Sequence, residues 1–168
     1  GMELKNEVTN NSGLETIARV GQSFRLPAAF DTLTWYGKGP WETYADRKDA
    51  ALIGLYTSSV AEQHVPFAVP CECGGHEDTR FAALSDGTHT VQIVGSDDFH
   101  FSALPYSMAE YRKAAYEEEL PEHTTGTWLI LDAAHAGLGG DTGWTKNIHP
   151  EYRVCKGRYS YTFRFHFA

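Results

Sequence analysis

The chain has 168 residues, of which 42% are hydrophobic and 21% are charged, so it is long enough to form one globular domain with its own core. Its formal net charge of −8 at pH 7 argues against nucleic acid as a partner, because a sequence-independent grip on phosphates needs clustered lysine and arginine. No apolar run approaches the roughly 20 residues of a membrane span, and no signal peptide precedes the first expected strand. A membrane is therefore not an expected partner either.

Short alternating segments separated by turn signals fill the first half of the chain. Leu4–Val8 alternates in this way, and Ala18–Leu26 places apolar and polar side chains on opposite faces, as in a half-buried strand. Further strands are expected at Leu33–Tyr36, Ile53–Val60 and His64–Val69. The last of these is flanked by prolines, which predicts an edge position. Trp41–Ala51 has no clear period and is predicted to be a long loop.

The second half begins with a predicted hairpin. Thr79–Leu84 and Thr90–Val94 are expected to pair through a turn that contains the dipeptide Asp-Gly, which favours tight hairpin turns. A charged turn, Ser96–Asp98, then precedes another expected strand at Phe99–Leu104.

One helix is expected, over Ser107–Leu120. Ser107 is a good N-cap residue, and Glu110 three positions later completes a capping box. Pro121 cannot continue a helix and sets the predicted end.

Two strands complete the chain. Trp128–Leu131 is apolar, and Tyr159–Phe167 alternates aromatic and polar residues without a break, which is the strongest strand pattern in the sequence. Many short strands with a single helix predict an all-β antiparallel sandwich. Residues 1–168 show no linker and no repeat, so they are predicted to form a single domain.

The stretch Gly137–Trp144 is too rich in glycine for a regular element, so it is predicted to be a tight loop. Asp141 can hold such a loop in one shape by bonding to local backbone amides. The indole of Trp144 has two interpretations. It faces a flat apolar ligand surface such as one side of a sugar, or it folds back and plugs the edge of the sandwich.

Two further sets of residues could carry chemistry. Cys71, Cys73 and His76 suggest a soft metal site, but the single residue between the thiols is too short for the usual zinc knuckle, so no metal and no cofactor are expected on this chain. His135 and His149 flank the glycine loop, where each could be a general base or a hydrogen-bonded structural residue.

A dense charged cluster follows the aromatic residues at positions 35 and 36. Glu42 and Arg47 offer acceptors and donors beside aromatic rings, which suits a polyhydroxylated ligand. The alternative is an ion-paired loop that packs over the sheet.

Four ordered motifs together resemble a known family. Trp35–Arg47 reads Trp-Tyr-Gly-Lys-Gly-Pro-Trp-Glu-Thr-Tyr-Ala-Asp-Arg. The other matching stretches are Val65–Gly74 with Arg80, the expected helix Ser107–Leu120, and Gly137–Trp144 followed by His149–Tyr152. In this order and spacing they are similar to the C-terminal small-chain domain of large multidomain bacterial β-galactosidases, glycoside hydrolase family two.

The resemblance implies a galactose-mutarotase-like supersandwich that sits over the mouth of a separate (β/α)₈ barrel. In that family the two catalytic glutamates are on the barrel, so no catalytic residue is expected on this chain and the barrel is an expected partner. The loop tryptophan closes one side of the β-galactoside pocket, which assigns that role to Trp144. The substrate-binding residues implied or suggested are Trp144, Asp141, Gly140, His135, Glu42, Arg47, Glu72 and Arg80.

The sequence departs from the family pattern at Thr43, where the family has asparagine, and at Cys71 and Cys73, which replace the amides beside Glu72. The family domain also has strands that precede those found here. Sheet edges are therefore expected to be exposed, which favours a homo-oligomer or completion by the missing part. A bacterial protein is implied, of the cytoplasm or the periplasm, and the sequence does not choose between them.

Two other functions stay open. A stand-alone carbohydrate-binding module would bind a galactoside without the barrel. An aldose epimerase would need a histidine acid and a carboxylate base on one face, and fold analogy alone is a poor guide to such an activity.

Overall fold

The computed structural model describes residues 1–124, 126–138 and 147–168. In chain order its strands are β1 (Met2–Thr9), β2 (Thr16–Ile17), β3 (Arg19–Leu26), β4 (Thr32–Gly39), β5 (Leu52–Ser59), β6 (Gly75–Ser85), β7 (Thr90–Leu104), β8 (Thr127–His135), β9 (Val154–Cys155) and β10 (Arg158–Phe167). Its helical segments are α1 (Met108–Lys113) and the 3₁₀ turns η1 (Ala61–Gln63), η2 (Glu117–Glu119) and η3 (Pro150–Tyr152). This confirms an all-β protein with one short α-helix.

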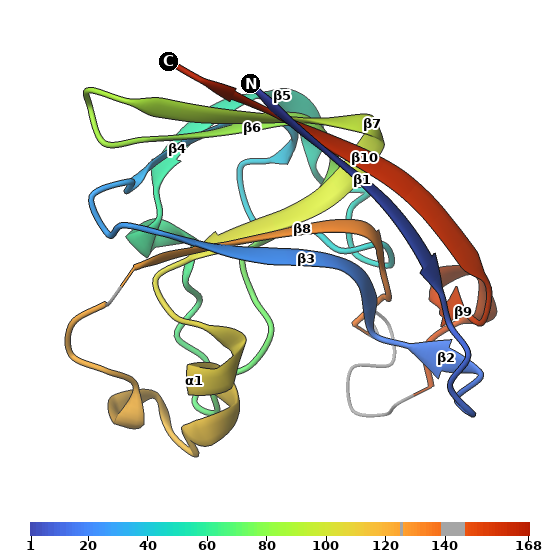
Figure 1. The fold of residues 1–168 in the computed structure, drawn as a ribbon. Helices are drawn as coiled ribbons and strands as arrows, with labels where there is room; N and C mark the ends of the chain where they lie inside the picture. The colour runs from blue at the N-terminus through green and yellow to red at the C-terminus, as the bar shows by residue number, and fades with distance from the viewer. Residues whose placement is uncertain (125, 139–146) are drawn as a thin grey trace.

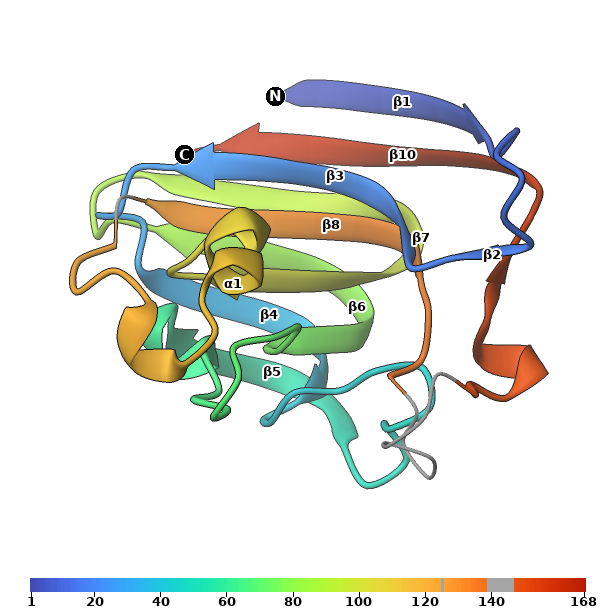
Figure 2. The same ribbon diagram turned by 90° about the horizontal axis from the view of Figure 1, so that it is seen from below.

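Eight strands form a single antiparallel sheet that is bent into two layers (Figure 1). One layer has the order β1-β10-β7-β6-β4-β5, and the second half of β7 continues into the other layer, where it pairs with β8 and β8 pairs with β3. A separate two-stranded ladder joins β2 to β9. The helix α1 lies on the outer side of the β3–β8 layer (Figure 2). The result is an open sandwich, as the strand patterns predicted.

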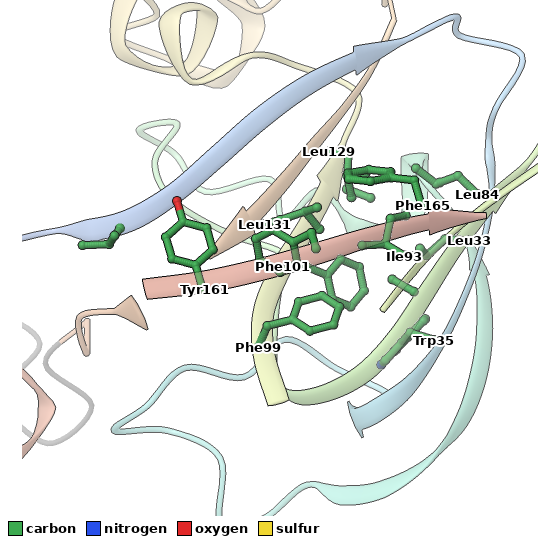
Figure 3. Packing of buried hydrophobic residues seen from close by; sticks show 14 of the residues in the cluster. Leu33, Trp35, Leu84, Ile93, Phe99, Phe101, Leu129, Leu131, Tyr161 and Phe165 are labelled. Carbon is green, nitrogen blue, oxygen red and sulfur yellow. The ribbon is translucent and has the colours of Figure 1, made fainter. Parts of the chain in front are cut away.

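The main core fills the space between the two layers (Figure 3). The alternation in β10 places its aromatic side chains inward, so that Phe163 is 1% exposed, whereas Phe167 at the end of the strand is 59% exposed. Other fully buried side chains in this core are Leu33, Leu84, Ile93, Phe101, Leu129 and Leu131. The predicted inward faces of the strands are therefore confirmed.

The helix covers a second, smaller core on the outer side of the β7–β8 layer. This core consists of Cys73, Leu104, Tyr111, Ala114 and Leu120. The capping box is confirmed, because the Ser107 hydroxyl accepts the Glu110 N–H at 3.1 Å and the Glu110 carboxylate accepts the Ser107 N–H at 2.6 Å.

The helix is shorter than predicted. It ends at Lys113, and the expected continuation to Leu120 is wrong. Ala114 is already extended, and Glu119 bends back to accept the Ala115 N–H at 2.7 Å. Three successive glutamates at 117–119 would oppose the dipole at a helix C-terminus, so the chain turns there instead.

The expected strand at His64–Val69 is also wrong, since this segment is a loop. Pro66 removes a backbone donor, and the imidazole of His64 is drawn toward the helix, where it bonds Tyr111 at 2.8 Å and Glu117 at 2.6 Å.

The expected turn at Ser96–Asp98 lies within β7, which runs on as one strand. Phe81 pairs with Val94 and Thr79 pairs with Phe99, so the residues between Val94 and Phe99 form a bulge opposite a single residue of β6. This irregularity marks the place where β7 passes from one layer to the other.

The remaining strand predictions are confirmed, including the hairpin between β6 and β7, whose Gly87 has a φ of 87°. The short β2–β9 ladder carries no sequence pattern and was not predicted. Cys71, Cys73 and Cys155 are free thiols. Within the described parts of the chain, the helices are too short to cross a bilayer.

Candidate functional site

The glycine loop leaves the end of β8, and its first residues are tied down on two sides. The Gly137 N–H donates to the Tyr152 carbonyl at 2.9 Å, and the Leu138 N–H donates to the Asp46 carboxylate at 3.0 Å. Asp46 belongs to the 41–51 loop, so two of the sequence motifs that lie far apart in the chain meet here.

Three of the predicted substrate-binding residues, Trp144, Asp141 and Gly140, lie outside the described residues. Their roles stay predictions. The other five predicted positions can be placed, and they divide among three locations in the structure.

Glu42 and Arg47 form the first location. They are ion-paired, and the Glu42 carboxylate also accepts the Gly74 N–H at 2.8 Å. The Arg47 guanidinium lies over the Tyr44 ring at 5.5 Å. The contacts of Glu42 therefore fix the 41–51 loop to the start of β6. The side chain of Arg47, in contrast, is half exposed.

Thr43 keeps a polar role even though it replaces an amide. Its hydroxyl accepts the Glu77 N–H at 2.8 Å, and its own N–H donates to the Gly75 carbonyl at 2.7 Å. These bonds extend the attachment of the 41–51 loop to β6.

Tyr44 is buried and packs against two histidine rings. Its ring centre lies 5.3 Å from that of His100 and 5.4 Å from that of His135, and its hydroxyl accepts the Gly75 N–H at 3.2 Å. A Cβ at Gly75 would lie 2.4 Å from His100 and 2.8 Å from Tyr44, so only glycine lets these rings pack. Burial raises the pKa of the Tyr44 hydroxyl, which stays protonated.

Glu72 and His135 belong to the second location, an ion-paired group that we call the outer cluster: Arg19, Glu72, Glu77, His100, Asp132 and His135. Arg19 at the start of β3 pairs with Asp132 of β8 at 2.6 Å and with Glu72 at 2.9 Å. A Cβ at Gly21 would lie 2.1 Å from the Asp132 carboxylate, so the close approach of β3 to Asp132 requires glycine.

The histidines of the outer cluster are neutral. Their rings stack with centres 4.4 Å apart, and burial lowers the pKa of His100 to about 4 and that of His135 to about 3. Burial also raises the pKa of Glu77 to about 7 and raises that of Glu72. The 2.8 Å contact between His100 and Glu77 is therefore a hydrogen bond rather than an ion pair.

Arg80 is at the third location. It is exposed on β6, where its guanidinium lies 3.6 Å from Asp98 and 5.4 Å from the Tyr36 ring centre. The neighbours of Arg80 are thus different from those of Glu42, Glu72 and His135. The other histidine considered, His149, is exposed and packs edge-on against Tyr152.

Three open grooves run beside the start of the glycine loop, and one of them is lined by Ile17, Gly137, Leu138 and Ile148. Each of the two others contains two of the predicted substrate-binding residues. One is lined by Trp41, Glu42, Asp46, Arg47 and Tyr152. The other is lined by Arg19, Cys71, Glu72, Arg112, His135 and Leu138. The described part of the site can therefore offer both hydrogen-bond donors and acceptors to a ligand held near this loop.

Sequence reasoning missed Arg19, His100 and Asp132. Asp132 follows three apolar residues in its strand, and His100 stands between two phenylalanines. A polar residue within an apolar run is a signal that could have identified both as candidate site residues. Their partners, however, come from other strands and loops.

The fold and the grooves define an all-β sandwich domain with a polar site at the end of one layer. Residues 1–165 match the family model described as the beta galactosidase small chain, and the chain belongs to this family.

Curated relatives agree with this assignment. The chain is 39% identical over 160 residues to a beta-galactosidase of Vibrio cholerae, covering 95% of this chain and 15% of the relative. It is 36% identical over 162 residues to a beta-galactosidase of Priestia megaterium, covering 96% of this chain and 16% of that protein. It is 37% identical over 148 residues to beta-galactosidase BgaC of Bifidobacterium adolescentis, covering 86% of this chain and 14% of the relative. The chain thus spans about one-seventh of the length of these relatives.

Proposed function

We propose that the chain is the C-terminal, non-catalytic part of a β-galactosidase, an enzyme that hydrolyses terminal non-reducing β-D-galactose residues in β-galactosides. The small-chain family match and the beta-galactosidase relatives support this proposal. The relatives are much longer than this chain, so the two glutamates of a retaining mechanism are expected on a separate catalytic domain.

The observation that carries the proposal is the attachment of the glycine loop to Asp46. Because Leu138 is bonded to Asp46, the loop that leads to Trp144 starts beside the groove that contains Glu42 and Arg47. An indole presented there would cover the apolar face of a galactose ring. Arg47, which is half exposed, can donate to its hydroxyl groups.

Exposed apolar residues on an edge strand support a role in assembly. β5 ends the order of its layer, and its Leu52 and Leu55 side chains are 75% and 66% exposed. Edge strands with apolar side chains favour contact with another surface. We therefore expect β5 to face the catalytic domain of the same enzyme or a second copy. Light scattering of the chain in dilute solution tests the second option, and a monomer would contradict it.

The decisive experiment is Trp144→Ala in a complete β-galactosidase that carries this domain. The expected result is a loss of at least about tenfold in kcat/KM for a β-galactoside, because the variant removes one wall of the pocket. Tyr116→Ala removes an exposed aromatic ring beyond α1 and serves as the control, with kcat/KM unchanged. A loss well under tenfold for the tryptophan variant would overturn the pocket role.

A stand-alone carbohydrate-binding module is the first alternative. Titration calorimetry of the chain with galactose separates the two, since the proposed function expects no binding without the catalytic domain.

An epimerase-like activity has one supporting observation, the 3.7 Å distance between His135 Nε2 and Glu72 Oε1. The low pKa of His135 leaves its ring neutral at pH 7, which argues against an imidazolium acid. Polarimetric measurement of galactose mutarotation checks this alternative directly.

A further inference from the structure

Three side chains of the outer cluster bring ligand-type atoms together. Glu72, His100 and His135 each offer one oxygen or ring nitrogen, and these atoms lie within 4.8 Å of one another. They come from the loop before β6, from the middle of β7 and from the end of β8, so three separate parts of the fold converge on one point.

Two polar atoms of these three side chains have no hydrogen-bond partner among the described residues. They are Nε2 of His100 and Oε1 of Glu72, and both are buried. The His100 side chain is 2% exposed. Buried polar atoms are nearly always bonded, so two unpartnered atoms in one cluster point to a group that binds there.

The opposite edges of the two rings are already bonded. Nδ1 of His100 is hydrogen-bonded to the Glu77 carboxyl group at 2.8 Å, and Nδ1 of His135 donates to the Ala136 carbonyl at 2.7 Å. Because Nδ1 of each ring is already bonded, Nε2 is the ring atom left for a metal ion, and Nε2 of His135 lies 3.7 Å from Glu72 Oε1. A carboxylate or a backbone carbonyl behind each imidazole is the arrangement that orients histidine ligands in metal sites.

The charges of the outer cluster also favour a cation. Glu72 and Asp132 are two carboxylates that share a single guanidinium, that of Arg19. A divalent ion would offset the remaining negative charge.

The place where Glu72, His100 and His135 converge is accessible from a groove on one side. Glu72 and His135 line the groove that also contains Arg19, Cys71 and Leu138. An ion could enter by this route, and one coordination position would face the groove.

We propose that Glu72, His100 and His135 form a binding site for a divalent transition-metal ion, with Zn²⁺ as the best match. Two imidazoles and a carboxylate are typical zinc ligands, and bonds of about 2.0–2.2 Å place tetrahedral ligand atoms about 3.4 Å apart. The 3.7 Å separation of Glu72 Oε1 and His135 Nε2 is already close to that value. The site is distinct from the Cys71–His76 pattern, whose His76 bonds Gln63 and the Lys38 carbonyl instead.

The test is a zinc titration of the chain, prepared without a histidine tag and stripped with a chelator. Competition against a chromophoric chelator is expected to give one equivalent of bound Zn²⁺, and Co²⁺ is expected to give the visible bands of a four- or five-coordinate ion. Failure of the parent chain to bind one equivalent would overturn the proposal whatever the variants do.

Variants then locate the ion. Glu72→Gln and His100→Gln are each expected to weaken zinc binding about 100-fold, and Glu77→Gln about tenfold, because it acts only through His100. His89→Gln changes an exposed histidine of the β6–β7 hairpin and is expected to leave the affinity unchanged. Circular dichroism checks that each variant is folded. Folded Glu72→Gln and His100→Gln proteins that bind zinc as tightly as the parent would place the ion elsewhere and overturn the site.

Discussion

The main core and the outer cluster occupy opposite faces of the same two strands. On β7, Phe101 faces the main core while its neighbour His100 faces the cluster. On β8, Leu131 and Asp132 divide in the same way. The main core is apolar and filled by alternate residues of adjacent strands, whereas the cluster is polar and completed by loops. The same pair of strands is therefore stabilised by apolar packing on one face and by polar contacts on the other. Substitutions on one face can test each contribution separately.

Truncation in the main core should have the largest effect. Phe101→Ala is expected to lower the free energy of unfolding by about 4 kcal/mol, because the side chain is fully buried and its removal leaves a cavity. Phe167→Ala removes the same ring from an exposed position and should cost less than about 0.5 kcal/mol. Urea denaturation measures both, and similar losses would contradict the interlayer packing.

Removal of a cluster carboxylate should come next. Asp132→Ala leaves the Arg19 charge without its buried partner and is expected to cost about 3 kcal/mol. Glu7→Ala breaks the pair with Arg158, in which both side chains are about two-thirds exposed, and should cost under about 0.5 kcal/mol. The same denaturation series checks the contrast. A small loss for the Asp132 variant would mean that Glu72 alone holds Arg19.

A buried histidine beside the main core should make stability depend on pH. Burial lowers the pKa of His76 to about 3, so below pH 6.5 the unfolded chain takes up a proton that the folded chain does not. Stability should therefore fall with acid from pH 6.5 toward pH 3, with His76 contributing about 1.4 kcal/mol per pH unit. His76→Gln should make the measured slope shallower by that amount. Equal slopes in the two proteins would exclude a neutral buried His76.

The smallest expected effect is at the helix that covers the smaller core. Ser107→Ala removes the side-chain cap of α1 and is expected to cost about 1 kcal/mol. Ser107→Asp keeps an acceptor at the same position and should restore most of the loss. Thermal unfolding followed by circular dichroism compares the two variants. No difference between them would show that packing alone holds the helix.

The contrast between the two faces also explains what the sequence could predict. The alternation in Tyr159–Phe167 and the capping box at Ser107 are local, so they gave the strand, its inward face and the start of the helix. The bulge in β7 depended on pairing with β6, so it could not be seen locally. The early end of the helix had a local signal in the glutamates at 117–119, but where the chain turns also depended on the packing of Leu120.

The candidate site was predictable only in part. Glu72 and His135 were chosen from a family motif and from their place beside the glycine loop. Arg19 and His100, which complete their surroundings, are brought there by strand register and by the Gly75 contact, and no spacing in the chain encodes these.

Because β7 belongs to both layers of the sandwich, it affects how the protein unfolds. Its first half pairs with β10 and its second half with β8, while β6 pairs along both. Neither layer can separate without breaking bonds of this strand, so its amide protons should exchange with solvent only when the whole sandwich unfolds. Hydrogen-exchange rates would then agree at the two ends of β7, even though His100 of its second half belongs to the polar outer cluster.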